Sequence, residues 1–539
     1  MKKHKIMRKT FYKIMIAFLP LFITGCGDFL EESSQDKDYI RSWKDLNELL
    51  LGDCYLPVNN TNTFTSHNNL GMFIHLLADE MEEQNLGNGI NDAVNNEHNY
   101  LYGIISWQPR IGSSENNTEF YTENREWKAF YKNINVANNV IEEAKDIPQN
   151  NDQEIEGKHK VLGEALFLRA FYYFWLTNMY GQPYDAKTAA TDLGVCIKTS
   201  PEIQDMMFTR NTVQECYDQI VADLLEAEEH LSMVTTFKHS LYRADVNAAR
   251  LLLSRVYLYM NNWAKSAEYA NKVIANHPDL EDLRTSRAKF MVAGNPENIF
   301  SMGGDDLMRM MSSMFQSTRV SLDLYSAYSF NDLRKSSWFW NYGTFTGYIR
   351  REPGTPTTEV TESERSWYNT WYYYPCTGLK SPVSSVFWLR SGEAYLNLAE
   401  AEAYQGNEGA AKEALRKLLV RRYMDGSKEL QLDETGSELI TRIRNERRLE
   451  TPLEGHRWFD LRRYRVCTVQ PEKVELTHTY TVYRDGSTGN IIETRLFKLE
   501  KEDQAWTVNI PHEVLEFNVG MPGNNTNPSR EYTIIPTPN

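Results

Sequence analysis

The chain has 539 residues, with 58 Lys and Arg against 73 Asp and Glu, and its formal net charge is −15. A chain this acidic, with no basic stripe, repels phosphate groups, which argues against a nucleic-acid partner. Aromatic residues make up 12% of the sequence, and such rings can stack on the faces of sugars.

The first residues have the order of an export signal. Six basic residues precede an apolar run at residues 14–23, which Pro20 interrupts. A membrane-spanning helix needs about 20 apolar residues, and this run is shorter. The order of charge and apolar residues therefore predicts a signal peptide at residues 1–25.

The stretch "ITGC", ending at Cys26, resembles the bacterial lipoprotein box. We therefore expect Cys26 to be lipidated and to begin the mature chain, which holds it on a membrane through more than one acyl chain. Removal of residues 1–25 takes away six positive charges, so the net charge moves from −15 to −21. The acidic residues that follow predict a flexible tether at residues 26–40.

Six cysteines occur, at positions 26, 54, 196, 216, 376 and 467. No pair has CxxC spacing, and an odd number remains once Cys26 is acylated, which argues against a full disulfide framework and against zinc. One disulfide bond among the other five cysteines is still possible. We expect no metal and no cofactor.

Helical patterns dominate the rest of the chain. Apolar residues recur at helical spacing in residues 126–148 and 212–231, and residues 163–181 are apolar nearly all round, which predicts a helix buried on most sides.

Residues 247–278 show the tetratricopeptide pattern of large, small and aromatic residues closed by a proline, and residues 390–422 show a related pair of helices. Small residues let two helices approach closely. Because such hairpins must stack to bury their apolar faces, they predict a superhelix.

Two stretches, residues 59–120 and 300–388, do not follow the helical pattern, and residues 476–499 alternate around a Gly-containing turn like a β-hairpin. The predicted fold is mainly α: a tetratricopeptide-like superhelix of about four hairpins with long irregular insertions and a small β-hairpin. We expect a single domain at residues 41–539.

Several segments, in order, give the chain a resemblance to the SusD/RagB family, the surface glycan-binding lipoproteins of Bacteroidetes. They are "CGDFLEE", "GEALFLRAFYYFWLTNMYGQPY", "NAARLLLSRVYLYMNNWAKSAEYANKVI", "LRSGEAYLNLAEAEAYQG", "IRNERRLETPLEGHRWFDLRRY", "IPHEVLEFNVG" and "NTNP".

The resemblance implies a lipid-anchored protein on the outer face of the outer membrane. It would capture an oligosaccharide or polysaccharide and deliver it to a SusC-type TonB-dependent transporter, with the helical repeats toward that partner. Two alternatives stay open: binding of a peptide or glycopeptide, and a repeat scaffold that binds only protein.

Aromatic residues in the irregular stretches are the candidates for sugar stacking, beside amides that can bond hydroxyl groups. They form three clusters in the sequence. The candidates are Asn96, Tyr100, Tyr102 and Trp107; Trp338, Trp340 and Tyr342; and Trp367 and Trp371.

No catalytic motif stands out, so we predict a binding protein and not an enzyme. The stretch "EGHRWFDLRRY" at residues 454–464 lacks the two-His spacing of HExxH sites. We interpret it as a structural charge network with its apolar residues packed inward. A glycosidase needs two carboxylates across a cleft, and the acidic cluster Asp79, Glu80, Glu82 and Glu83 is interpreted as a solvated helix end.

Overall fold

The helices predicted from the sequence are present in the computed structural model. It describes residues 40–56, 70–84, 92–115, 123–285, 290–303, 318–342, 345–348, 383–484, 490–524 and 529–536. Residues Trp43–Asn539 form one compact unit. Its helices are α2 (Trp43–Leu49), α3 (Ile74–Leu77), α4 (Asp92–Ile105), α5 (Arg125–Glu143), α6 (Asp152–Tyr180), α7 (Val213–Ser232), α8 (Val246–Tyr259), α9 (Trp263–Asn276), α11 (Leu322–Ala327), α12 (Leu333–Trp338), α13 (Ser391–Tyr404), α14 (Glu408–Leu419), α15 (Gly436–Glu450), α16 (Arg457–Arg465) and α17 (His512–Phe517).

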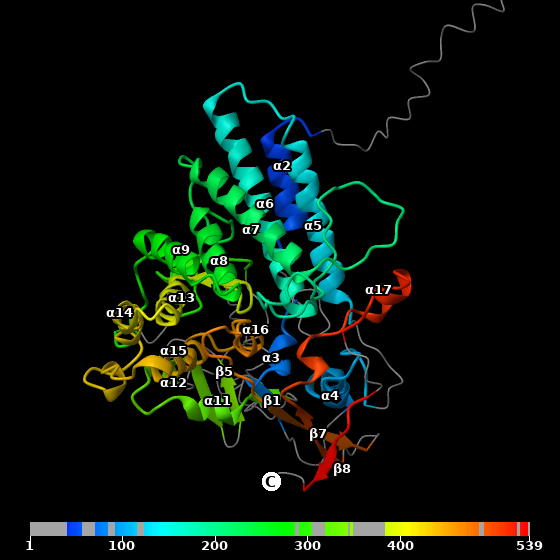
Figure 1. Ribbon diagram of the computed structural model, residues 1–539, viewed down its shortest axis with the longest axis vertical. Coiled ribbons are helices and arrows are strands. Elements are labelled where there is room, and N and C mark those ends of the chain that lie inside the picture. The colour runs from blue at the N-terminus through cyan, green and yellow to red at the C-terminus, as the bar shows by residue number, and fades with distance from the viewer. Residues whose placement is uncertain are drawn as a thin grey trace, which may run out of the picture. The chain divides into compact units, whose positions relative to one another are not determined.

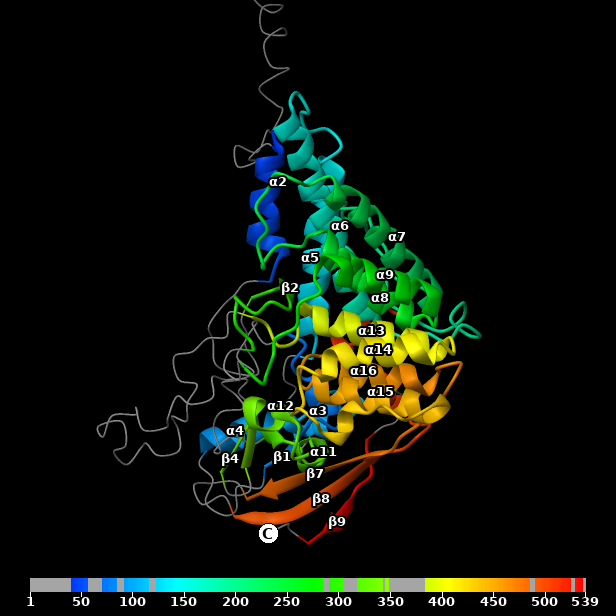
Figure 2. The ribbon, with the colours of Figure 1, turned by 90° about the vertical axis from the view of Figure 1, so that its left-hand side faces the viewer.

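The helices pack in chain order, each on its neighbour. Helix α6 lies between α5 and α7, α8 packs on α7 and α9, and α13 packs on α9, α14 and α15. Figures 1 and 2 show this stack descending from α7 through α8, α9 and α13 to α15. The predicted fold class, a mainly helical tetratricopeptide-like stack with a small β-hairpin, is confirmed.

Helix α6 is the core of the upper part of the unit in Figure 1. Residues 163–180 are buried without interruption, as their apolar sequence predicts. Gly157, near the start of the helix, allows the ring of Trp43 to lie against the backbone: a Cβ at Gly157 would stand 2.3 Å from that ring.

The α8–α9 hairpin is closed by two serines. The Ser254 hydroxyl donates to the carbonyl of Ser266 at 3.0 Å, and the Ser266 hydroxyl donates back to the carbonyl of Ser254 at 2.9 Å. Both side chains are fully buried. The small residues of the repeat pattern thus let the helices approach and also satisfy each other's polar groups.

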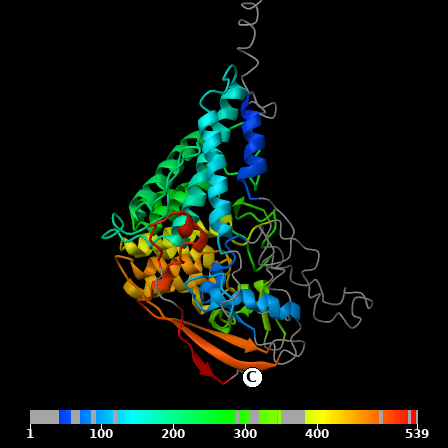
Figure 3. The same ribbon diagram turned by 90° about the vertical axis from the view of Figure 1, so that its right-hand side faces the viewer.

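Short antiparallel pairs of strands make up the described β-structure. β1 (Met81–Glu83) pairs with β3 (Thr318–Val320), β2 (Asn298–Ser301) with β6 (Trp388–Arg390), and β4 (Phe339–Tyr342) with β5 (Phe345–Tyr348). The predicted hairpin is confirmed as β7 (Leu476–Tyr483) and β8 (Ile491–Leu499), and β9 (Thr533–Ile535) adds a third strand that the sequence did not predict. Strands β7, β8 and β9 lie in the lower part of Figures 1 and 3.

The prediction that residues 59–120 lack regular helix is wrong for α4, a 14-residue helix. Its sequence, "DAVNNEHNYLYGII", is rich in asparagine, which has low helix propensity. Contacts with β7 and α3 stabilise it.

No helix in the described part of the chain combines the length and apolarity required to cross a membrane.

Gly157→Ala should destabilise the unit, because the new methyl group must displace the ring of Trp43. We expect the free energy of unfolding to fall by about 1–3 kcal/mol, measured by thermal and urea unfolding.

The matched control is Gly409→Ala on α14, where a Cβ would meet nothing within 4 Å. There the helix propensity of alanine should raise stability by about 0.5–1 kcal/mol. Equal effects of the two substitutions would contradict the close Trp43–Gly157 packing.

Candidate functional site

Trp107 is part of the core and does not present its ring to solvent. The side chain is 1% exposed, the ring stacks on His478 at 4.2 Å between centroids, and the indole Nε1 donates to the carbonyl of Leu77 at 3.0 Å. These contacts hold a backbone φ of 51°, which is rare for a bulky residue. Trp107 is therefore a structural residue here, which corrects its place among the sugar-stacking candidates.

Trp338 and Tyr102 are buried as well. Trp338 is 0% exposed, with Phe290 at 4.8 Å between ring centroids. Tyr102 packs edge-on against Tyr480 at 5.1 Å and is buried. In this structure neither aromatic ring offers an open face to a ligand, so both leave the candidate set.

Four of the other candidates lie on two elements in the lower part of the unit. Trp340 and Tyr342 are on β4, and Asn96 and Tyr100 are on α4; the structure describes their backbone only. Figures 2 and 3 show both elements in the part of the unit opposite the upper ends of α5–α7. Trp367 and Trp371 lie outside the described residues.

Phe330, between α11 and α12, is an exposed aromatic residue outside the predicted candidates, with a side chain that is 88% exposed. It lies beside Asn331, whose side-chain amide donates to the Glu429 carboxylate at 3.5 Å. The Asn331 carbonyl accepts a hydrogen bond from the backbone N–H of Met424 at 3.0 Å. The signal that could have indicated it is the turn-forming pair Asn331-Asp332 directly after an aromatic residue.

The segment before β4 is held by Asp332 and Arg334. The Asp332 carboxylate accepts a hydrogen bond from the backbone N–H of Arg334 at 3.0 Å and caps the start of α12. The Arg334 guanidinium binds Asp332 at 2.7 Å, Glu446 at 2.8 Å and Glu450 at 3.1 Å. Because Glu446 and Glu450 belong to α15, these bonds attach α12 and β4 to the helical stack.

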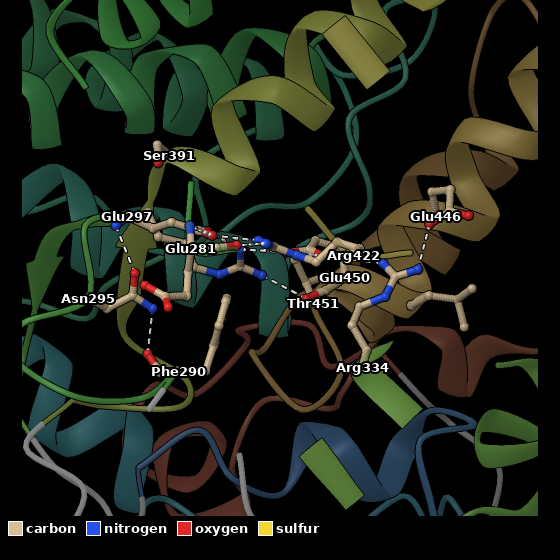
Figure 4. A network of polar contacts seen from close by, with 12 residues as sticks. Glu281, Phe290, Asn295, Glu297, Arg334, Ser391, Arg422, Glu446, Glu450 and Thr451 are labelled. Atoms are coloured by element: carbon tan, nitrogen blue, oxygen red, sulfur yellow. Dashed lines mark hydrogen bonds and ion pairs between the residues drawn. The ribbon is translucent and has the colours of Figure 1, made fainter. Parts of the chain in front are cut away.

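Glu450 is the centre of a buried ion network (Figure 4). Its carboxylate also accepts from Arg422 and from Arg390, both at 2.8 Å. Glu297 binds the same two guanidinium groups, at 2.5 Å from Arg422 and 2.8 Å from Arg390. The network therefore connects the residue before β2, strand β6, the segment after α14, and the helices α12 and α15.

Electrostatics keep Glu450 ionised. Burial alone would raise its pKa, but Arg422, Arg390 and Arg334 outweigh burial and lower the pKa well below its usual range. Since the pKa is lower in the folded chain, the stabilisation is present above the ordinary carboxyl pKa and is lost as pH falls through the folded value.

The interpretation of residues 454–464 as a structural network is confirmed. Arg463 binds Glu400 at 2.7 Å and Asp460 at 2.7 Å, and Arg447 binds Glu400 at 2.9 Å. Burial, followed by nearby arginines, lowers the pKa of His456 well below its ordinary value, which keeps the ring neutral. The apolar residues Trp458, Phe459 and Leu461 are buried.

The interpretation of residues 79–83 as a solvated helix end is wrong. Helix α3 ends at Leu77, and the acidic residues follow it into β1. Asp79 accepts two bonds from Arg457, at 2.7 and 2.8 Å. Glu80 is fully buried between His75, at 2.9 Å, and the backbone N–H of Leu453, at 2.7 Å. Arg457 and the backbone of Leu453, both far along the chain, offset the cost of burying Asp79 and Glu80. The local sequence does not show these partners.

Glu83 and His98 form a buried pair where α4 meets β1 and β7. Glu83 accepts from the backbone N–H of Thr481 at 2.6 Å, and His98 Nε2 lies 2.8 Å from the Thr481 carbonyl and 3.4 Å from Glu83. Burial raises the pKa of Glu83 to about 7 and lowers the pKa of His98 to about 4. Both groups are therefore uncharged in mildly acidic solution.

Four of the six cysteines form no disulfide bond: Cys54, Cys196, Cys216 and Cys467 carry free, buried thiols. Among the residues that the structure describes, no three His, Cys, Asp or Glu side chains are placed to hold a metal ion together.

Comparison with known proteins identifies the family. One family model, described as starch-binding associating with outer membrane, matches residues 33–258, and the model of the SusD family matches residues 310–528. Together the two cover most of the sequence. The chain belongs to the SusD/RagB family.

Individual relatives are distant. A SusD-like protein of Bacteroides ovatus is 23% identical over 372 residues, which are 62% of this chain and 64% of that protein. The match thus spans less than two thirds of the relative's length.

Solved structures share the fold. A structure titled putative sugar binding protein from Bacteroides vulgatus matches with a TM-score of 0.65 at 18% identity, over 90% of this chain and 99% of that one. A SusD superfamily protein from Bacteroides thetaiotaomicron matches with a TM-score of 0.62 at 21% identity, over 90% and 99% of the two chains.

Glu450→Gln should destabilise the unit strongly, because three buried guanidinium groups lose their shared anion. We expect the free energy of unfolding at pH 7 to fall by about 3–5 kcal/mol, measured by urea unfolding. The control is Glu413→Gln, whose exposed carboxylate pairs with Lys417 at 3.3 Å; a change within about 0.5 kcal/mol is expected there. A small effect at Glu450 would contradict a central role of the network.

Glu83→Gln should alter the pH dependence of stability. Between pH 4.5 and about 7 the folded chain keeps a proton on Glu83 that the unfolded chain releases, so the contribution of this group to stability falls as pH rises. His98, with its lowered pKa, contributes the opposite slope up to its ordinary pKa, and this residue is present in both chains.

The variant should therefore gain stability relative to the original chain between pH 4.5 and 7, by up to about 3 kcal/mol. Urea unfolding at several pH values measures this difference. Glu475→Gln, at an exposed carboxylate just before β7, is the control. A difference that is independent of pH would show that Glu83 ionises normally.

Proposed function

We propose that this chain is a surface lipoprotein that binds an oligosaccharide or polysaccharide without altering it and delivers it to a SusC-type TonB-dependent transporter. The observation that carries the proposal is its membership in the SusD/RagB family, one of whose matching models is described as starch-binding associating with outer membrane. The lipoprotein box at Cys26 supports anchoring at the outer face of the outer membrane.

We propose that the glycan site is made by α4, by β4 and by the segment between β5 and β6. Trp340 and Tyr342 on β4, Asn96 and Tyr100 on α4, and Trp367 and Trp371 in the segment between β5 and β6 are the candidate contacts. Each would supply a stacking ring or an amide for hydroxyl groups. Binding sites often sit on long loops that a rigid scaffold positions.

The buried ion network supports this assignment through rigidity. Arg334 fixes α12, and β4 begins directly after α12, so candidate aromatic residues start from a firmly held position. A site whose supporting residues are already in place loses less conformational entropy on binding. Individual sugar contacts are weak, so we expect dissociation constants from about micromolar to millimolar, or about −8 to −4 kcal/mol.

We propose that the positions of the repeats and the insertions allow the bound glycan to pass to the transporter. The helical repeats would face the transporter while the insertions hold the glycan, so that a captured oligosaccharide lies over the pore. No catalytic residue takes part, since the chain only binds and releases.

Alanine substitution tests the site. Among Tyr100, Trp340, Tyr342, Trp367 and Trp371, we expect at least one single alanine variant to weaken binding of the recognised oligosaccharide about tenfold or more, because a stacking ring contributes over 1 kcal/mol. Isothermal titration calorimetry gives the affinity.

The matched control is Trp263→Ala on α9, a partly exposed tryptophan whose ring packs on Tyr404 at 4.4 Å within the helical stack. Its affinity for the glycan should not change. Unchanged affinity in all five variants would exclude these residues as the site, and binding of a peptide in place of every glycan would favour the peptide alternative.

A further inference from the structure

Two neighbouring segments carry a group of exposed apolar side chains. The first is the loop before α7, and the second is the end of α17. Each of the five side chains is between 57% and 101% exposed: Ile203, Met206, Met207, Phe517 and Val519. We name these five residues the 203/517 patch. Exposed apolar side chains that gather in this way mark contact surfaces more often than isolated ones do.

The two segments are fixed to each other by polar contacts. The backbone N–H of Phe208 donates to the Asn518 side chain at 2.9 Å. The Arg210 guanidinium donates to the Pro522 carbonyl at 3.1 Å and to the Asn524 side chain at 2.8 Å. The Phe208–Asn518 bond joins the residue directly beside Met207 to the residue between Phe517 and Val519, and Arg210 holds the end of the same loop to the chain beyond α17. We therefore treat the apolar side chains of both segments as one surface.

Apart from Arg210, which is buried, and His512, which lies 2.9 Å from Glu516, the charged residues next to the patch are acidic. Glu202 and Asp205 lie within the loop, and Glu513 and Glu516 lie on α17; all four are exposed. Residues 201–209 and 512–519 contain no lysine or arginine. The surface therefore has an apolar centre and a negative rim. Most protein interfaces are built in this way, with an apolar core and a polar edge.

We infer that the 203/517 patch docks a protein partner that offers an apolar recess edged by lysine or arginine. The inference rests on the proposed function, which supplies the candidate partner, the outer-membrane transporter. Phe517 and the two methionines would enter the recess, since aromatic residues dominate binding energy and methionine adapts to irregular surfaces. The four carboxylates would fix orientation and speed association.

The charge pattern favours a protein over a lipid surface. Membrane surfaces carry negative charge and attract basic segments, whereas this rim would be repelled. The patch also has only one aromatic ring, and four of its five side chains are aliphatic or methionine, which suits apolar packing better than stacking on sugars.

Co-purification tests the inference. The full lipidated chain, with an affinity tag, is extracted in mild detergent from outer membranes that contain its transporter, and recovery of the transporter is quantified. The variants Met206→Glu and Phe517→Glu place a charge in the apolar centre, and each should lower recovery about tenfold or more. Because both side chains are exposed, the melting temperature should stay unchanged.

A rim variant and a control complete the design. Glu202→Lys with Asp205→Lys should lower recovery at low salt and less so at high salt, because screening removes the repulsion. Ile534→Glu on β9, at an apolar side chain of similar exposure (61%), should have no effect.

The outcomes separate the two proposals. Failure of the unaltered chain to recover any transporter would contradict the proposed partner, and this inference with it. Recovery that is equal for the unaltered chain and for Met206→Glu and Phe517→Glu would overturn only the 203/517 patch. Binding of the unaltered chain, but not of Phe517→Glu, to protein-free vesicles with anionic lipid would assign the patch to the membrane and also overturn it.

Discussion

Glu450 is buried between Arg334, Arg390 and Arg422, and the arrangement of the insertions on the helical stack depends on this contact. An unpaired charge in the protein interior costs several kcal/mol, so the carboxylate and the guanidinium groups are stable only together. They come from α15, α12, β6 and the segment after α14, which therefore assemble as one unit. Glu297, directly before β2, binds Arg390 and Arg422 in the same way.

The two parts of the chain that this network joins are stabilised in different ways. The helices α5–α9 and α13–α15 use repeated, local packing, in which each element rests on its neighbours. The short strands and α4 combine aromatic packing, such as Trp107 on His478, with buried ionic and polar contacts, such as Asp79 with Arg457 and Glu83 with Thr481. A rigid stack can in this way carry loops whose sequence is free to adapt to a ligand.

The helical part could be predicted because its signals are local. The spacing of Leu253, Ser254 and Tyr257 indicates the α8–α9 hairpin, and the apolar run from Gly163 indicates the buried α6. The site was less accessible to sequence reasoning. Trp107 looks like a stacking residue until His478, far along the chain, covers its ring. The acidic run at Asp79 looks solvated because its partners, such as Arg457, are equally distant in sequence.

The most direct measurement is native affinity electrophoresis of residues 27–539 in gels that contain a panel of polysaccharides. Binding of a glycan by the folded chain predicts that one class of polysaccharide slows its migration, while the others leave it unchanged. Unchanged migration in every gel, for a sample whose circular dichroism and cooperative melting show that it is folded, would contradict polysaccharide capture by this chain.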